Sequence, residues 1–382
     1  MKILAMSLVT LAGLSGSLVS RAADFDGDSR DDVAVFRPST GLWAVRGVTR
    51  AYFGGTGDEA RPGDFNGDGI ADIAIYRGTT GLWAVRGVTR TYFGSSSDTA
   101  IQGGGGQRTY DYVVKPNDGD DLKAALESET YNSVYIPAGY YSVGSDITVD
   151  NVQMISGAGT PLIGNSTGTT INLGTNCNLI LTTSGGVTVE NLMVQNGGGT
   201  YGQIYVTTNA DYSRLINVHA VGSDHYAFNA AAGADYVTLI SCMAFTSDSY
   251  GFYGFVDHCA MTNCRTKNCD ATAFYNCDNL SGCIADGGES SINGFYSCER
   301  LSSCLATGCT NHGFTTCDML SACEGENNSN YGFYNCSRLS ACKAMSNDTY
   351  GFGSCNYLSA CYAFDNGTDN WYNCNYIAAS NN

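Results

Sequence analysis

The stretch GFYNCSRLSACKA, residues 332 to 344, decides the fold, because its spacing is repeated along the last third of the chain. An aromatic anchor is followed after three residues by a Cys, after six by a Leu, after nine by a second Cys and after eleven by a small residue. Apart from one interval of 21, the anchors recur every 19 residues, and they are Phe255, Phe274, Phe295, Phe314, Phe333, Phe352 and Trp371. A period of 19 is too short for two helices and a loop but fits one turn of a β-solenoid.

Stacking such turns about 4.8 Å apart would align identical side chains in columns along a continuous core. The sequence therefore predicts an all-β fold whose main part is a solenoid of about 19–24 residues per coil.

Thirteen of the 17 cysteines fall on the two columns of this repeat. They are Cys277, Cys298, Cys317, Cys336, Cys355 and Cys374 in one column, and Cys242, Cys264, Cys283, Cys304, Cys323, Cys342 and Cys361 in the other. Small buried thiols are favoured over a disulfide ladder, because in-register parallel strands do not readily give the torsion that a disulfide requires. The off-column residues Cys177, Cys259, Cys269 and Cys309 are better candidates for pairing.

Composition and the N-terminal residues limit where the protein is expected to be located and what it is expected to bind. The 382 residues carry a formal charge of −17, which excludes nucleic acid as a partner, because phosphates demand a basic surface. Residues 1–22 resemble a secretory signal peptide, with Lys2 before an apolar run and small residues near Ala22. No later stretch reaches the roughly 20 apolar residues of a membrane span. A secreted or cell-surface protein is expected.

Residues 23–102 contain a duplicated unit of 40 residues, because GLWAVRGVTR at 41–50 returns unchanged at 81–90. An acidic loop precedes each copy, and acids at alternate positions can converge on a hard cation such as calcium. The predicted ligands are Asp24, Asp26, Asp28 and Asp32 in one loop, and Asp64, Asn66, Asp68 and Asp72 in the other. An EF-hand is excluded, because Val35 and Ile75 stand where a bidentate acid is needed. A solvated acidic turn is the alternative.

After a Gly-rich linker at 103–109, residues 110–382 form the solenoid domain. Acidic residues at 117–121 predict the start of a helix over Leu122 to Ser128 that covers the open end of the solenoid. Short β runs separated by Gly, Asn and Ser turns follow, such as Ile147 to Val149 and Leu179 to Leu181.

Two families resemble these segments. The acidic loops resemble the Asp-x-(Asp/Asn)-Gly-Asp-x-x-x-Asp loops of FG-GAP/VCBS repeats, which implies calcium between strands of a propeller blade. Two blades cannot close a propeller, so either a small open module or several chains are implied. The segment from Asp118 to Leu126, followed by Val134 to Gly139, is similar to the opening of right-handed parallel β-helix proteins of the pectin-lyase-like class. That class includes lyases, hydrolases and non-catalytic adhesins, so the resemblance implies the fold and not an activity.

No set of acids and bases with the spacing of a known polysaccharide-cleaving site is found in the sequence. His312 matches one element of the polygalacturonase pattern but lies at a repeat position that other coils fill with Tyr. Asp211, Asp224 and His225, with His219 and Asp235 nearby, form the least regular cluster and are the weak catalytic candidates.

Strand alternation predicts that the residues directly after the buried anchors point outward, and these include Tyr275, Tyr296, Tyr334 and Tyr372. Exposed aromatic residues in a column can bind sugar rings, whereas ordinary packing of tyrosines between coils is the alternative. The leading hypothesis is a secreted, calcium-stabilised, non-catalytic carbohydrate-binding or adhesion protein. A polysaccharide lyase or glycoside hydrolase is the first alternative. A filament subunit that self-associates end to end through its last coil is the second.

Overall fold

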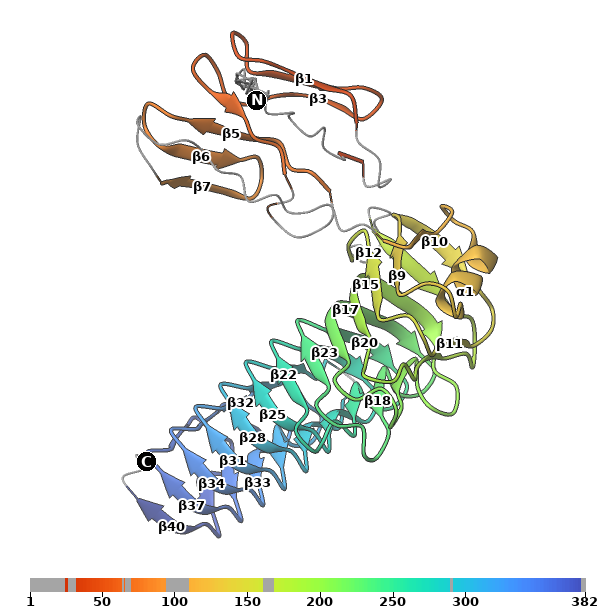
Figure 1. Cartoon of the computed structure of the whole chain (residues 1–382). Helices are drawn as coiled ribbons and strands as arrows, with labels where there is room; N and C mark the ends of the chain where they lie inside the picture. The colour runs from red at the N-terminus through yellow and green to blue at the C-terminus, as the bar shows by residue number, and fades with distance from the viewer. Residues whose placement is uncertain are drawn as a thin grey trace, which may run out of the picture. The chain divides into compact units, whose positions relative to one another are not determined.

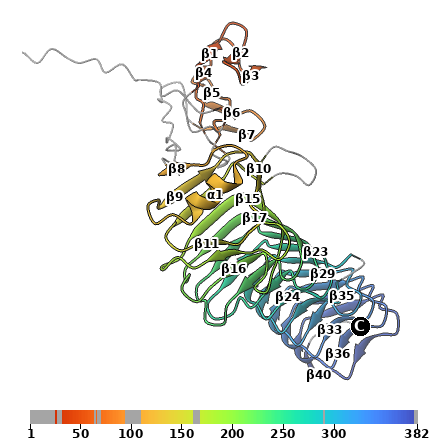
Figure 2. The ribbon, with the colours of Figure 1, turned by 90° about the vertical axis from the view of Figure 1, so that its right-hand side faces the viewer.

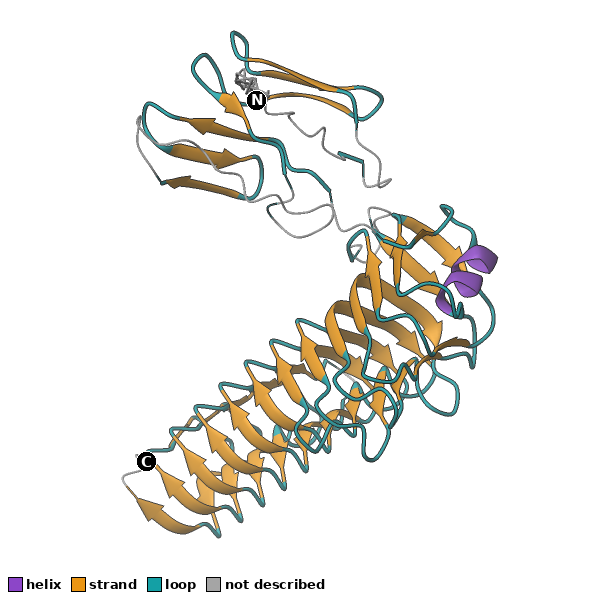
Figure 3. Cartoon of the chain, viewed as in Figure 1, coloured by secondary structure: helices purple, strands orange, loops and turns teal. Residues whose placement is uncertain are grey.

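The computed structural model describes residues 25–26, 32–63, 65, 70–93, 110–160, 168–288 and 291–378. The predicted signal peptide at 1–22 and the linker at 103–109 lie outside these residues. The chain divides into two compact units between Gly105 and Gly106. The fold is all-β, with 3% helix, and consists of a parallel β-solenoid of about 12 turns and small antiparallel sheets at the N-terminus (Figure 3).

The N-terminal unit has one antiparallel sheet for each copy of the duplicated sequence. The first sheet contains β1 (Ala34–Arg37), β2 (Leu42–Val45) and β3 (Thr49–Tyr52). The second contains β4 (Glu59–Ala60), β5 (Ala74–Arg77), β6 (Leu82–Val85) and β7 (Thr89–Tyr92). Because β4 follows the first copy in sequence and pairs with β5, the second sheet has one strand more than the first.

The solenoid has three rows of parallel strands (Figure 1). One row is an 11-stranded sheet of β11 (Ile147–Val149), β14 (Leu179–Leu181), β16 (Ile204–Val206), β18 (Phe228–Ala230), β21 (Phe252–Tyr253), β24 (Thr272–Tyr275), β27 (Asn293–Tyr296), β30 (Phe314–Thr315), β33 (Tyr331–Tyr334), β36 (Tyr350–Gly353) and β39 (Asp369–Tyr372). We call it the Phe row, after the aromatic side chains that it buries.

The other two rows form one 22-stranded sheet. The Leu row contains β8 (Tyr112–Val113), β9 (Ser133–Ile136), β12 (Met154–Gly157), β19 (Thr238–Ile240), β22 (Ala260–Thr262), β25 (Asp278–Ser281), β28 (Glu299–Ser302), β31 (Asp318–Ser321), β34 (Ser337–Ser340), β37 (Asn356–Ser359) and β40 (Asn375–Ala378). The Ala row contains β10 (Gly139–Ser142), β13 (Thr169–Asn172), β20 (Met243–Ser247), β23 (Arg265–Cys269), β26 (Ile284–Asp286), β29 (Leu305–Thr307), β32 (Glu324–Glu326), β35 (Lys343–Met345) and β38 (Tyr362–Phe364). The long strands β15 (Thr188–Gly197) and β17 (Arg214–Ser223) belong to both rows.

The predicted column of anchors is present from Phe274 onward. Consecutive Phe rings from Phe274 to Phe352 stack with centroids 4.6–4.9 Å apart and interplanar angles of 5–9°. All of these Phe side chains are fully buried, so each coil adds one ring to a continuous aromatic core.

The first predicted anchor, Phe255, is wrong. Phe274 pairs with Phe252 instead, at an interval of 22 residues. Phe255 is also buried, but it lies above Cys277, since the Asp278 amide donates to the Phe255 carbonyl at 2.8 Å. The extra residues form a wider turn in which Gly254, Asp257 and His258 all have positive φ.

The coil changes direction at four positions with left-handed backbone, and most of these residues are not glycine. In one coil they are Asn335 (φ 51°), Arg338 (56°), Ala341 (52°) and Ser346 (51°). Non-glycine residues in this conformation cost about 1–2 kcal/mol each, so packing between coils must hold them there.

A buried amide ladder supports one of these corners. Nδ2 of Asn328 donates to Oδ1 of Asn347, and Nδ2 of Asn347 donates to Oδ1 of Asn366, both at 2.9 Å. The same oxygens accept from backbone amides of the preceding coil, so the ladder satisfies polar groups that packing has removed from water.

The predicted helix is present as α1 (Gly119–Leu126), and it ends two residues earlier than expected. Asp118 caps its N-terminus by accepting a hydrogen bond from the Asp121 amide at 2.9 Å. Leu122, Ala125 and Leu126 are buried in the solenoid core, and α1 contacts β9, β10 and β11 (Figure 2). The helix therefore covers the N-terminal end of the solenoid.

All 17 cysteines are free thiols, including the four that were predicted to pair. Most thiols of both columns lie within hydrogen-bond distance of two backbone carbonyls. Sγ of Cys298, for example, lies 3.5 Å from the carbonyl oxygens of Phe274 and Tyr296. Burial raises the pKa of Cys259, Cys269 and Cys309 to about 12, so these thiols are protonated and act as small core residues. Among the described residues, no helix has the length and apolar character of a membrane span.

Candidate functional site

The predicted tyrosines of the Phe row lie in one outward column. Tyr253, Tyr275, Tyr296, Thr315, Tyr334, Gly353 and Tyr372 are partners in successive strand pairs. Tyr253 was missed in the sequence, because the wrong anchor placed Val256 at this position. Tyr275, Tyr296 and Tyr334 are half-buried and Tyr372 is exposed. We call these seven residues the tyrosine column.

The rings of this column stack on one another rather than standing apart. Tyr275 lies 5.2 Å from Tyr253 and 5.3 Å from Tyr296 between ring centroids, with interplanar angles of 4°. The faces of an interior ring are thus covered by its neighbours, and its outer edge remains for solvent. A sugar ring can therefore meet hydroxyl-bearing edges here, whereas the predicted stacking on ring faces is blocked inside the column.

A ring from a neighbouring position fills one of the two gaps in the column. The Tyr331 ring lies over Gly353, where an added Cβ would clash with its Cε1 atom. The His312 ring lies 4.9 Å from the Tyr334 ring of the next coil, between ring centroids. Nδ1 of His312 accepts a hydrogen bond from the Tyr331 amide at 3.3 Å, and burial lowers the pKa of His312 to about 4. His312 is thus a neutral, packed repeat variant.

A second outward column, at the corner between the Phe and Leu rows, is more exposed. Every member has left-handed backbone, with φ of 54–67°, and the members are Tyr212, Tyr236, His258, Asn279, Arg300, Met319, Arg338, Tyr357 and Tyr376. We call it the corner column. Tyr212 (60%) and Tyr376 (72%) are among its exposed rings. Tyr212 stacks on Tyr236 at 4.9 Å, and Tyr357 stacks on Tyr376 at the same distance.

The corner column was missed, although the sequence carries a signal for it. The tetrapeptides CDNL, CERL, CDML, CSRL, CNYL and CNYI start at residues 277, 298, 317, 336, 355 and 374, and their third residues belong to the column. Backbone preferences do not indicate a left-handed corner at these positions, because Arg, Met and Tyr rarely adopt positive φ. Only the spacing of 19–21 residues could have revealed it.

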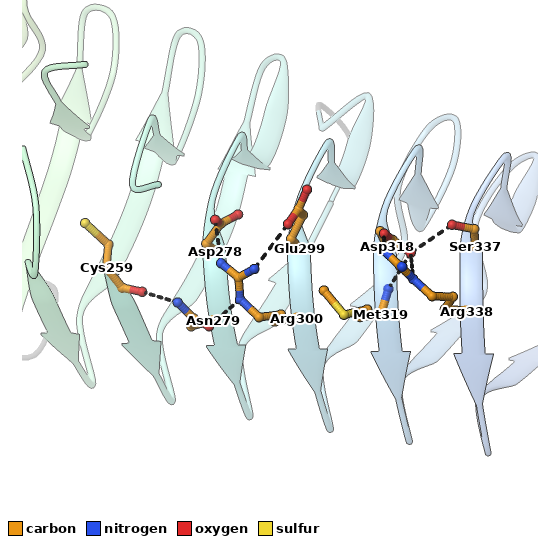
Figure 4. A network of polar contacts seen from close by, with 9 residues as sticks. All are labelled: Cys259, Asp278, Asn279, Glu299, Arg300, Asp318, Met319, Ser337 and Arg338. Atoms are coloured by element: carbon orange, nitrogen blue, oxygen red, sulfur yellow. Dashed lines mark hydrogen bonds and ion pairs between the residues drawn. The ribbon is translucent and has the colours of Figure 1, made fainter. Parts of the chain in front are cut away.

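A row of acids runs beside the corner column (Figure 4). Asp278, Glu299 and Asp318 are partners in successive strands, and Ser337, Asn356 and Asn375 continue the row. Burial raises the pKa of Asp278, against the opposing effect of Arg300.

Arginines of the corner column neutralise these acids (Figure 4). Arg300 donates from Nη2 to Asp278 at 2.8 Å, from Nη1 to Glu299 at 3.2 Å and from Nε to Asn279 at 2.7 Å. Arg338 pairs with Asp318, which also accepts from the Ser337 hydroxyl at 2.8 Å. The tyrosine column, the corner column and the acid row together form what we call the corner surface.

The structure does not bring the weak catalytic candidates together. Asp211 precedes the ten-residue strand β17 (Arg214–Ser223) and Asp224 follows it. Oδ1 of Asp211 accepts from the Asp235 amide at 2.8 Å, and Oδ2 of Asp224 accepts from the Asn176 amide at 3.1 Å. Asp211 thus joins turns of adjacent coils, and Asp224 joins turns that lie two coils apart.

The histidines near these acids are partly withdrawn from solvent. The His225 ring lies 3.9 Å from the Tyr226 ring, and its Nδ1 atom is buried. Burial lowers the pKa of His219. His258, in contrast, lies exposed in the corner column, stacked on Tyr236 at 4.7 Å.

The acidic loops of the N-terminal unit are described in part. Asp24, Asp28, Asp64, Asn66 and Asp68 lie outside the described residues. Of the rest, Asp32 accepts from the Phe25 amide at 2.7 Å and Asp72 accepts from the Phe65 amide at 2.9 Å, in the same way in both loops. Within the described part of the chain, no group of three or more His, Cys, Asp or Glu could hold a metal. Calcium binding stays a prediction, with carboxylate oxygens that suit a hard cation.

Comparisons with known proteins bear on the fold alone. No protein family and no curated protein matches the chain. Among solved structures, ORF18 of Geobacillus virus E2 matches with a TM-score of 0.47 and 13% identity over 81% of this chain and 68% of that one. The catalytic domain of a GH87 alpha-1,3-glucanase in complex with tetrasaccharides matches with a TM-score of 0.45 and 10% identity, over 94% of this chain and 100% of that one. The A-module of the Azotobacter vinelandii mannuronan C-5 epimerase AlgE6 matches with a TM-score of 0.44 and 15% identity, over 71% of this chain and 98% of that one. These likenesses are too weak to assign an activity.

Proposed function

We propose that the solenoid binds a neutral polysaccharide lengthwise along the corner surface, without cleaving it. The observation that carries this proposal is the repetition of the same outward columns from coil to coil. Polar and aromatic side chains point outward in register, at the spacing of parallel strands of about 4.8 Å, and their chemical identity varies from coil to coil. A polymer of repeated hydroxyl-bearing units can therefore meet polar or aromatic groups at successive coils.

The charge of the chain favours a neutral glycan over an acidic one. The formal charge is −17, and Arg300 and Arg338 are already paired with acids of the same surface. A polyanionic glycan would meet net repulsion.

The proposal assigns no catalytic step, because the acids nearest to the histidines bind turn amides. We further propose that the protein is exported and that calcium at the acidic loops stabilises its N-terminal unit. A chelator should then lower the melting temperature of that unit. An unchanged melting curve would remove the calcium claim.

A glycan array with the full chain tests the binding proposal. Neutral polysaccharides should bind, and the double variant Tyr357→Ala with Tyr376→Ala should weaken binding at least several-fold. Tyr52→Ala is the matched control, because Tyr52 is 74% exposed and belongs to the N-terminal unit. Equal binding by the double variant and the control variant would contradict the assignment of the surface.

The same samples distinguish the alternatives. New reducing ends or unsaturated products would favour a hydrolase or a lyase. End-to-end polymers in electron micrographs would favour a filament subunit. The last coil could form such a contact through Ile377, which is 46% exposed, whereas its partner Leu358 in the preceding coil is 1% exposed.

A further inference from the structure

The two N-terminal repeats have nearly the same sequence but differ in exposure. Val33 and Val35 are 66% and 58% exposed, whereas Ile73 and Ile75, 40 residues later, are 7% and 2% exposed. Equivalent positions on equivalent strands thus bury their apolar side chains only in the second repeat. The partner of such a face can be identified, because the structure includes the residues that cover it in the second repeat.

The first repeat covers this face of the second. Trp43, Val45 and Ala51 belong to the same buried cluster as Ile73 and Ile75, and Phe53 packs against that cluster. Strand alternation places Val35 and Trp43 on opposite faces of the first sheet, since Val35 pairs with Ala44 and Trp43 pairs with Phe36. The interface is therefore of the head-to-tail kind, in which one face of a repeat meets the opposite face of the next.

An ion pair joins the same two repeats. Asp58, after the first sheet, accepts from Nε and Nη2 of Arg77 at 2.6 and 2.9 Å, and its carboxylate is fully buried. Arg37, the equivalent of Arg77, is exposed. The strand β1 is likewise an edge of its sheet, whereas β4 covers the equivalent strand β5.

The opposite end of the unit exposes part of the complementary face, whereas Val85, the equivalent of Val45, is buried like it, at 4% exposure. Phe93 is 77% exposed and Val88 is 40% exposed. Their equivalents Phe53 and Val48 are half-buried against the cluster between the repeats. The unit thus ends in a leading face, with Val33 and Val35, and a trailing face, with Val88 and Phe93. Between the two repeats of one chain, a trailing face with the same apolar residues covers a leading face.

We propose that the leading face of one chain binds the trailing face of a second copy, through the interface that already joins the two repeats. Such a heterologous contact closes into a ring when its rotation allows it. Rings of repeated antiparallel sheets typically take 4–8 blades, so two repeats per chain correspond to two, three or four chains.

Light scattering on the full-length protein tests this proposal. The unaltered chain should form a closed oligomer of two to four copies. Val35→Glu and Phe93→Glu should each give monomers, because every contact between copies needs both faces and each variant places a charge in one of them. Tyr52→Glu is the matched control, since Tyr52 and its equivalent Tyr92 are exposed in both repeats (74% and 67%). It should leave the oligomer unchanged.

Mixing the two variants gives the sharper result. Each retains one intact face, so the mixture should form a dimer of one Val35→Glu chain and one Phe93→Glu chain and stop there. A monomeric unaltered chain at high concentration would overturn the proposal. So would an oligomer that survives in both variants, since it would then be held elsewhere. Circular dichroism of each variant separates lost assembly from lost folding.

Discussion

At the scale of single residues, the cysteines behave as core side chains. Fifteen of the 17 thiols are buried, and only Cys177 and Cys374 are half-buried. Burial raises the pKa of the Cys298 thiol well above the ordinary value, so this thiol is a poor nucleophile. We expect a thiol reagent without reductant to label at most two cysteines of the folded protein quickly, and all 17 after denaturation. Fewer than 17 after denaturation would indicate disulfides.

His312 makes stability depend on pH. Its folded pKa is about 4, below the ordinary value of about 6.5, because burial disfavours the charged ring. The unfolded chain therefore binds more protons between these values, and the stability present above pH 6.5 is lost as pH falls toward 4. The loss is at most roughly 3.4 kcal/mol, for about 2.5 pKa units at about 1.36 kcal/mol per unit.

The variant His312→Asn isolates this effect, because Asn293 fills the equivalent position one coil earlier. Urea denaturation at pH 7 and pH 4.5 should show a smaller loss for the variant than for the unaltered protein. Equal losses in the two proteins would show that other groups carry the pH dependence.

At the scale of structural elements, the amide ladder holds the corner between the Ala and Phe rows. Replacing Asn347 by Ala removes the acceptor for two hydrogen bonds from Asn328 and leaves a buried amide unpaired. We expect a loss of about 1–3 kcal/mol in the free energy of unfolding. Thr368→Ala, at an exposed position two residues after Asn366, should change it by less than about 0.5 kcal/mol. Similar losses in both variants would argue against the ladder as a stabilising element.

The elements that the sequence predicts well are those whose side chains repeat without insertions. From Phe274 onward, the spacing predicts the buried rings and both thiol columns, because each coil repeats the same inward pattern. Spacing gives the wrong anchor before Met261, where three extra residues widen the turn. Both Phe252 and Phe255 are buried there, so burial alone does not distinguish them. The exposed corner column was missed, because packing forces residues such as Arg338 into a backbone conformation that their own preferences disfavour. Spacing alone also cannot tell whether outward tyrosines stand apart or stack.

At the scale of the whole molecule, the solenoid is a one-dimensional stack in which each coil pairs with its two neighbours. Removing a whole coil should therefore preserve the fold. Deleting residues 328–346 joins Asn327 to Asn347, so that Asn347 takes the place of Asn328 and Phe352 takes the place of Phe333. Every column stays continuous. We expect a folded protein with an unchanged β-type circular dichroism spectrum and a slightly smaller urea m-value, because less surface is exposed on unfolding.

A shorter deletion supplies the control, since it breaks the register instead of preserving it. Removing residues 328–336 joins the same Asn327 to Ser337 and shifts the following residues by an odd number, which turns side chains of the core toward solvent. This variant should aggregate or unfold at a lower urea concentration than the whole-coil deletion. On the proposed function, the folded 19-residue deletion should also bind its glycan more weakly, because one set of repeated contacts is gone. If the two deletions were equally stable, the vertical alignment of side chains would not be what holds the solenoid together.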